Sequence, residues 1–273
     1  MSRSRTRSSK KKTVTIAVLV ACLLLAAIGG TIAWMTAQDS LTNQFTVGNF
    51  NDPTTKPDPD KPEQGGNEDL DGEDESKLNG HLYEPNWTEN SKLLPGSTVK
   101  KDPIVGIGVG SEDAYVFLYV DNNINKVNDP VYFTIDTTKW EPVEGKVYEA
   151  QNVTSADPGY VGEDTEYYTG GLFMYTEKLS CGDTGKDAWT TPLFEEVYVK
   201  NSATGTDFDL TPSETNNYAA IEVTALLHQT EDPADGTPED LEKVAVQWAK
   251  DQVGALEDAT QNTKLPIVRE SQG

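Results

Sequence analysis

The chain has 273 residues and carries 22 basic against 45 acidic side chains, a formal net charge of −23. Six of the bases lie in the first 12 residues and all acids follow residue 33, so residues 34–273 carry a net charge of −29. This charge argues against a nucleic-acid-binding protein and against docking on anionic lipid, because both need clustered cations. It suits a self-repelling extracellular protein or one that meets cations.

The N-terminus has the three-part layout of a secretory signal peptide. Residues 1–12 are basic and rich in serine, residues 13–28 form an uncharged apolar run, and small residues then continue to Ala33. The last three of these form a small-x-small site, so we predict a signal peptide over residues 1–33 and cleavage between Ala33 and Trp34. The protein is therefore expected to be secreted, extracellular or attached to the cell surface, and to meet the membrane only before cleavage.

Two other interpretations of the apolar run remain open. The 22 residues from Thr13 to Trp34 are long enough to cross a bilayer of roughly 30 Å as an uncleaved anchor, with the bases holding the N-terminus inside. Alternatively, Cys22 closes a lipobox-like sequence of a lipoprotein. Cys181 is the only other cysteine, so cleavage leaves no intramolecular disulfide, which fits export from a Gram-positive bacterium.

Residues 34–50 are predicted to contain an N-terminal strand, over residues 38–50. Leu41, Phe45, Val47 and Phe50 supply its apolar contacts, although the alternation of polar and apolar residues is imperfect. These four residues are the candidate contacts for assembly.

The segment 51–78 differs from its surroundings in composition. It holds four prolines and ten acids and few apolar residues, so burial cannot offset the entropy of ordering it. We predict a disordered linker or a long exposed loop here. Its Asn67-x-Asp69-x-Asp71-Gly72 matches the first half of an EF-hand loop, but the twelfth position is Leu78 and no helix flanks it. We therefore expect no defined calcium site and no cofactor, and only weak Ca²⁺ binding by the acidic segment.

Residues 79–255 are predicted to form an all-β sandwich, because many short runs of β-branched and aromatic residues alternate with Gly, Asn, Asp and Pro. The candidate strands are 97–108, 113–121, 130–136, 143–149, 171–177, 193–200 and 219–228. Residues 115–120 are apolar on both faces, which predicts a central strand that is covered twice.

One C-terminal amphipathic helix is predicted to follow the strands. Thr237-Pro238-Glu239-Asp240 resembles a capping box, and Leu241, Val244, Ala245 and Trp248 then share one apolar face. Gly254 is the expected stop, and residues 256–273 are expected to be a polar tail.

The sequence offers little for catalysis. His81 and His228 are the only histidines, and neither a His-Glu-x-x-His helix nor a Cys-x-x-Cys pair is present. A zinc hydrolase needs two or three protein ligands and a base, so we expect His228 to be a hydrogen-bonded structural residue. Cys181 lies in a turn-like context, and as a nucleophile it would need a histidine partner. No catalytic, cofactor-binding or metal-binding residue is assigned.

Three blocks of sequence resemble the TasA/camelysin family, exported proteins of Gram-positive bacteria that depend on a SipW-type signal peptidase. The first runs from Gly29-Gly30-Thr31-Ile32-Ala33-Trp34 to Phe45-x-x-Gly48-x-Phe50, although Met35-Thr36-Ala37 departs from the family's Phe-x-Asp. The second begins at Leu94-Pro95-Gly96, and the third comprises residues 221–229 with Trp248.

The resemblance implies a jelly-roll or immunoglobulin-like β-sandwich with one C-terminal helix, processed by a SipW-type signal peptidase. It further implies a structural subunit of extracellular matrix or biofilm fibres that self-assembles when the N-terminal strand of one copy completes the sheet of the next. The alternatives are a camelysin-like surface metallopeptidase and a monomeric surface adhesin or binding module.

Overall fold

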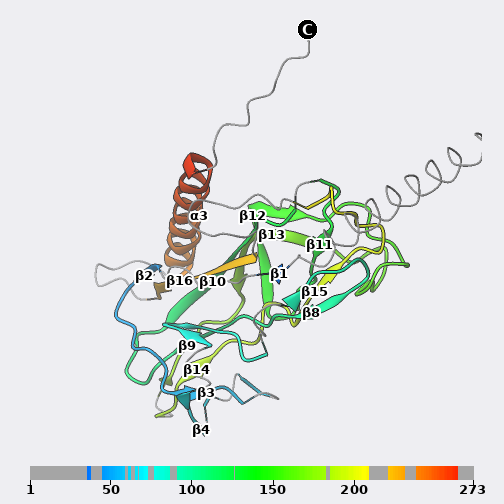
Figure 1. The fold of residues 1–273 in the computed structure, drawn as a ribbon. Helices are drawn as coiled ribbons and strands as arrows, with labels where there is room; N and C mark the ends of the chain where they lie inside the picture. Colours follow the sequence, from blue (N-terminus) through cyan, green and yellow to red (C-terminus); the bar gives the residue numbers. More distant parts are fainter. Residues whose placement is uncertain are drawn as a thin grey trace, which may run out of the picture.

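The computed structural model describes residues 36–37, 45–58, 61–62, 65–66, 68–72, 77–86, 91–125, 127–182, 185–208, 221–230 and 238–263. These residues form an all-β sandwich with one C-terminal helix, as predicted (Figure 1). The predicted cleavage site at Ala33 and Trp34 lies outside the described residues, and so does Leu41. No helix in the described part of the chain is long and apolar enough to cross a membrane.

The largest sheet has five strands in the order β12-β13-β10-β16-β2. Their bounds are β12 Trp140–Glu149, β13 Tyr168–Tyr175, β10 Ala114–Asn122, β16 Ile221–Gln229 and β2 Phe45–Val47. The neighbours in this sheet pair antiparallel, except that β2 runs parallel to β16.

The second layer of the sandwich consists of two smaller sheets. One has the order β11-β15-β8, with bounds Val131–Tyr132, Glu196–Val199 and Thr98–Lys100. The other has the order β14-β9-β6-β5, with bounds Ala188–Trp189, Ile104–Ile107, Leu82–Tyr83 and Leu78–Asn79. Two short pairs complete the described strands: β1 Thr36–Ala37 with β7 Ser91–Lys92, and β3 Thr55–Lys56 with β4 Glu68–Asp69.

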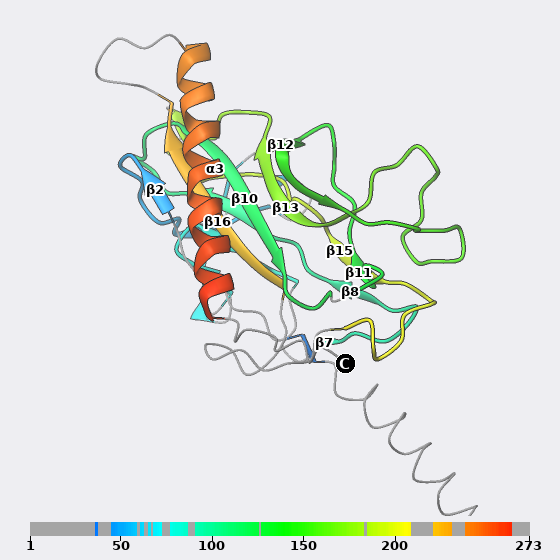
Figure 2. The same ribbon diagram turned by 90° about the horizontal axis from the view of Figure 1, so that it is seen from above.

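Strand β10 is buried on both faces, as its sequence predicts. Val116, Leu118 and Val120 belong to the core that the two layers share. Tyr115, Phe117 and Tyr119 belong to a second cluster beneath the helix α3 (Pro238–Thr263). Figure 2 shows this helix lying along the face of the five-stranded sheet. The molecule therefore has three layers: a helix, a large sheet and a set of smaller sheets.

Helix α3 begins at Pro238 as predicted, but two details of the prediction are wrong. The buried residues recur every fourth position at Leu241, Ala245, Ala249 and Val253, and Val244 remains 53% exposed. Gly254 does not end the helix, which runs on to Thr263, so residues 256–263 are helical rather than part of a polar tail. A helical glycine costs only about 1 kcal/mol, and the next turn compensates because Leu256 packs on the cluster under the helix.

The described part of residues 51–78 also differs from the exposed linker that its composition predicts. Pro53, Pro57 and Pro62 are buried, and so are Gly65 and Gly66. Prolines lose little conformational entropy on folding, since their φ is already fixed. The segment is held on the body by hydrogen bonds from residues far along the chain, which composition alone does not reveal.

Candidate assembly site: the N-terminal strand and its docking segment

Strand β2 forms one edge of the five-stranded sheet, beside β16 (Figure 2). The register pairs Phe45 with Leu226, Thr46 with Leu227, and Val47 with His228. A backbone hydrogen bond contributes about 0.5–1.5 kcal/mol net, so a three-residue ladder is worth only a few kcal/mol. The strand predicted for assembly is therefore paired within its own chain, through a short ladder.

The structure describes three of the four predicted contact residues. Phe45 and Val47 lie in β2, and Val47 is half-buried. Phe50 lies beyond the strand, where its half-buried ring packs on the main core and meets the His81 ring edge-on at 6.2 Å. Leu41, the fourth, is not among the described residues.

Residues 49–55, which follow β2, form a docking segment that sequence reasoning missed. Asn49 and Glu112 bind one another: the N–H of Asn49 donates to Oε2 of Glu112 at 3.0 Å, and the N–H of Glu112 donates to the carbonyl of Asn49 at 3.1 Å. Two residues later, the N–H of Asn51 donates to Oγ of Ser111 at 2.8 Å, and the carbonyl of Asn51 accepts from Gly108 at 2.7 Å.

The far end of the docking segment is bound by the buried carboxylate of Asp187. Its Oδ2 accepts from the N–H groups of Thr54 (2.6 Å) and Thr55 (2.7 Å) and from the Thr55 hydroxyl (2.8 Å). Its Oδ1 accepts from the N–H of Val109 at 3.0 Å. Burial raises the pKa of Asp187, but these hydrogen bonds outweigh burial and hold the pKa below its ordinary value.

Gly48 joins β2 to the docking segment. Its φ of +133° is a conformation that L side chains rarely adopt. A Cβ here would approach Cβ of Gln229 and the Phe50 ring to 3.0 Å. The chain therefore changes direction at the one residue between a weakly held strand and a firmly held segment.

The two histidines are structural in this arrangement. His81 is buried beneath the docking segment, where Nδ1 lies 2.9 Å from the carbonyl oxygen of Gly106 and burial lowers its pKa. His228 is buried as well. Its Nδ1 lies 2.8 Å from the Gln229 carbonyl, and its ring meets Trp248 of α3 edge-on at 5.4 Å.

The other candidate groups for chemistry are also accounted for by packing. The Cys181 sulfur lies 3.4 Å and 3.3 Å from the carbonyls of Ile107 and Gly108, and burial raises the pKa of its thiol. Asp69, of the EF-hand-like sequence, lies in the extended strand β4. Within the described residues, no group of three or more His, Cys, Asp or Glu side chains could hold a metal ion.

The apolar residues of β2 could be identified from the sequence. The docking segment could not, because its hydrogen bonds join residues that are more than fifty positions apart. Comparison with protein-family models, with curated proteins and with solved structures found no match to this chain.

Proposed function

We propose that this chain is a structural protein of the cell surface or extracellular matrix, a TasA-like fibre subunit whose copies assemble through the N-terminal strand. The observation that supports this proposal most is the short parallel ladder between β2 and β16, next to a firmly docked segment. Cleavage of the predicted signal peptide by a SipW-type peptidase would release the exported chain from the membrane.

Strand exchange between copies follows from the energetics of this edge. A β2 strand from a second copy would make the same ladder on β16 that the chain makes with its own strand. Strand exchange therefore loses few contacts. A copy that donates its strand to the next copy receives an equivalent strand from the previous one. Repetition of such a head-to-tail contact builds an open filament. The net charge of −29 on residues 34–273 opposes association until salt, protons or divalent cations screen it.

The hydrogen bonds of the docking segment support an exchanged strand that ends at Gly48. Residues 49–55 stay bound to Glu112, Ser111 and Asp187, so only the chain before Gly48 is free to move without breaking those contacts.

The test compares the chain beginning at Trp34 with a chain beginning at Asn49, which loses β2 and keeps the docking segment. Size-exclusion chromatography and negative-stain microscopy follow both between pH 4 and 7.5, with and without calcium. We expect filaments from the first and monomers from the second. Monomers from both, or filaments from both, would overturn the proposal.

A matched pair of substitutions in the longer chain serves as the control. Thr46 lies in the middle of β2 and its side chain is exposed. Thr46→Pro removes a backbone donor and fixes φ, so it should abolish filaments, whereas Thr46→Ala leaves the backbone ladder intact and should preserve them.

A further inference from the structure

A pocket lies on the five-stranded sheet, away from the assembly strand β2. It has a volume of about 390 Å³ and is formed where the end of β10 meets β12, β13 and helix α3. Its residue Asp121 pairs with Glu222 near the start of β16, whereas β2 pairs with residues 226–228 near the other end of that strand. We name it the Tyr119 pocket. Its volume falls within the roughly 300–1,000 Å³ that small-molecule sites occupy.

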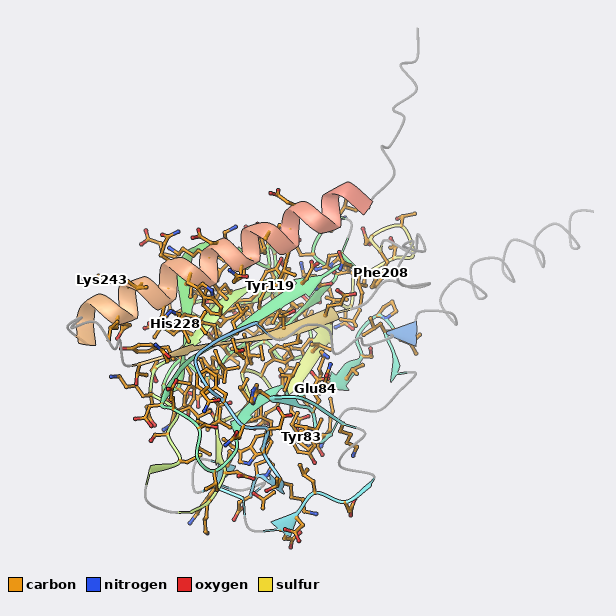
Figure 3. All side chains as sticks on the ribbon, turned by 90° about the vertical axis from the view of Figure 1, so that its left-hand side faces the viewer. Tyr83, Glu84, Tyr119, Phe208, His228 and Lys243 are labelled. Carbon is orange, nitrogen blue, oxygen red and sulfur yellow. The ribbon has the colours of Figure 1, made fainter. Side chains whose placement is uncertain are left out.

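The Tyr119 hydroxyl is the unusual feature of this pocket. Tyr119 is 4% exposed and lies beneath α3, as Figure 3 shows. Its side chain lines the pocket. Burial, and then the charges of Asp121 and Glu257, raise the pKa of Tyr119, so the group stays protonated. A protonated phenol hydroxyl can donate a hydrogen bond to a ligand that enters the pocket.

An aromatic ring is held rigidly at the rim of the pocket. Tyr148 is 48% exposed, and its hydroxyl donates to Oε1 of Glu257 at 2.6 Å. Oε2 of the same Glu257 accepts from Nζ of Lys146 at 2.7 Å. An exposed aromatic side chain that is fixed in this way loses little entropy when a ligand stacks on it.

The carboxylates of the pocket are fixed as hydrogen-bond acceptors. Asp121 accepts from the side-chain amide of Asn123 at 3.1 Å, and Asp129 accepts from the N–H of Gln151 at 3.1 Å. Glu257 is already neutralised by Lys146. No group of three or more described His, Cys, Asp or Glu side chains could hold a metal ion, so we treat the carboxylates of the pocket as separate acceptors.

The donor, the acceptors and the ring together match a sugar. Each hydroxyl of a sugar both donates and accepts, and the C–H face of the sugar ring packs on an aromatic face. An acidic sugar would be repelled by Asp121 and Asp129. We infer that the Tyr119 pocket binds a neutral sugar unit of a polysaccharide, which accepts from Tyr119, donates to Asp121 and Asp129, and stacks on Tyr148. This binding activity is separate from strand assembly.

The experiment uses the ¹⁵N-labelled chain beginning at Trp34, which keeps every residue that the structure describes. Amide resonances are followed during titration with cellotriose, maltotriose and chitotriose, and in parallel with calcium chloride and with spermidine. We expect at least one trisaccharide to shift residues 119–125, 148, 169–170 and 257 in a saturable way. Trisaccharides are added up to about 10 mM, a concentration that would detect weak small-molecule binding. The inference would be overturned if no trisaccharide shifted these residues, or if a cation alone shifted them.

Two substitutions separate binding from folding. Tyr119→Phe removes only the hydroxyl and keeps the ring that packs beneath α3, so it should weaken trisaccharide binding about fivefold and leave the chain folded, with a melting temperature close to that of the wild type. Tyr148→Ala should weaken binding about tenfold. Tyr160→Phe, on a ring stacked on Tyr167 outside the pocket, is the matched control and should leave binding unchanged. Unchanged binding in both pocket variants would contradict the assignment. Loss of sugar binding leaves the filament test unaffected, so the two proposals can fail independently.

Discussion

The carboxylate of Asp187 binds Thr55 twice, through the backbone N–H at 2.7 Å and through the hydroxyl at 2.8 Å. The two residues are 132 positions apart, and Asp187 immediately precedes β14 in the second layer. Residues 45–55 therefore connect the two layers of the sandwich, because β2 pairs with the large sheet while Thr55 is held by the smaller one.

Removal of the Asp187 charge should loosen this connection. Asp187→Asn keeps the shape of the side chain but replaces one carboxylate oxygen by an NH₂ group. That group then faces N–H and O–H donors in place of an acceptor. A buried, charge-assisted set of this kind is worth about 2–3 kcal/mol, so we expect a loss of that size in the free energy of urea unfolding at pH 7. Asp164→Asn, at an exposed loop position, is the control and should change stability by less than about 0.5 kcal/mol. Equal effects of the two substitutions would show that Asp187 does not hold the segment.

Acid should remove the difference in the free energy of unfolding between the wild-type chain and Asp187→Asn. The pKa of folded Asp187 lies below the ordinary value of roughly 3.9, so its stabilisation is fully present above that pH and is lost as pH falls through the folded pKa. Asp157 and Asp207 have lowered pKa values and act in the same direction, whereas burial raises the pKa of Asp102, which acts in the opposite direction. Comparison of two chains that differ only at Asp187 cancels these groups. Urea unfolding of the two chains is measured from pH 7 to pH 2, and the difference in their unfolding free energies should shrink only below about pH 4. A difference that stays constant over this range would contradict the role of the Asp187 carboxylate.

Two glycines should respond to alanine in opposite ways. Gly48→Ala places a Cβ 3.0 Å from two neighbours at a φ of +133°, so it should cost about 1–3 kcal/mol. Gly254→Ala adds a Cβ in open space within α3 and should stabilise the chain by about 0.5–1 kcal/mol. Thermal unfolding of both variants checks the pair. A neutral Gly48→Ala would mean that the connection between β2 and the docking segment is not constrained as the structure has it.

The buried ion pair between Lys101 and Glu84 should be costly to break. Lys101 Nζ lies 2.8 Å from Oε1 of Glu84, and both side chains are 1% exposed. Lys101→Met leaves a buried carboxylate without its cation, so we expect a loss of about 3–5 kcal/mol, part of which Glu84→Gln in the same chain should restore.

The matched control for this pair is Lys139→Met. Lys139 also lies 2.8 Å from its partner, Glu177, but that pair is partly exposed. The control should therefore cost less than about 1 kcal/mol. Similar losses for the two lysine variants in urea unfolding would contradict the role of burial.

The sequence predicted those parts of the fold that depend on local pattern. The double-sided apolar run of β10 and the start of α3 at Pro238 were confirmed, since each follows from residues a few positions apart. The predicted strand 97–108 was only partly right, because residues 101–103 divide it into β8 and β9. Pro103 has no N–H for a ladder, and Lys101 turns inward to Glu84 instead.

The remaining features depend on contacts between distant residues. Proline and acid content predicted an exposed linker over residues 51–78, and nothing within that segment indicates that Asp187 binds it. The same holds for the Tyr119 pocket. The alternation of residues places Tyr119 in a central strand, but the pocket exists only because Tyr148 and Glu257, from distant parts of the chain, come together beside it. Phe45, Val47 and Phe50 were identified as candidates by composition, and their use in assembly stays a prediction.

Donation of β2 from each copy to the β16 edge of the next gives the proposed filament a polarity. Because each copy would offer one acceptor edge and one donor strand, one tip would expose a β16 edge without a strand and the other would carry a strand without an acceptor. The two tips would then be chemically distinct, and each could be capped separately. A soluble peptide of residues 34–48 would stop elongation at the acceptor tip alone, so growth from the two tips of a seed would respond differently to the same inhibitor.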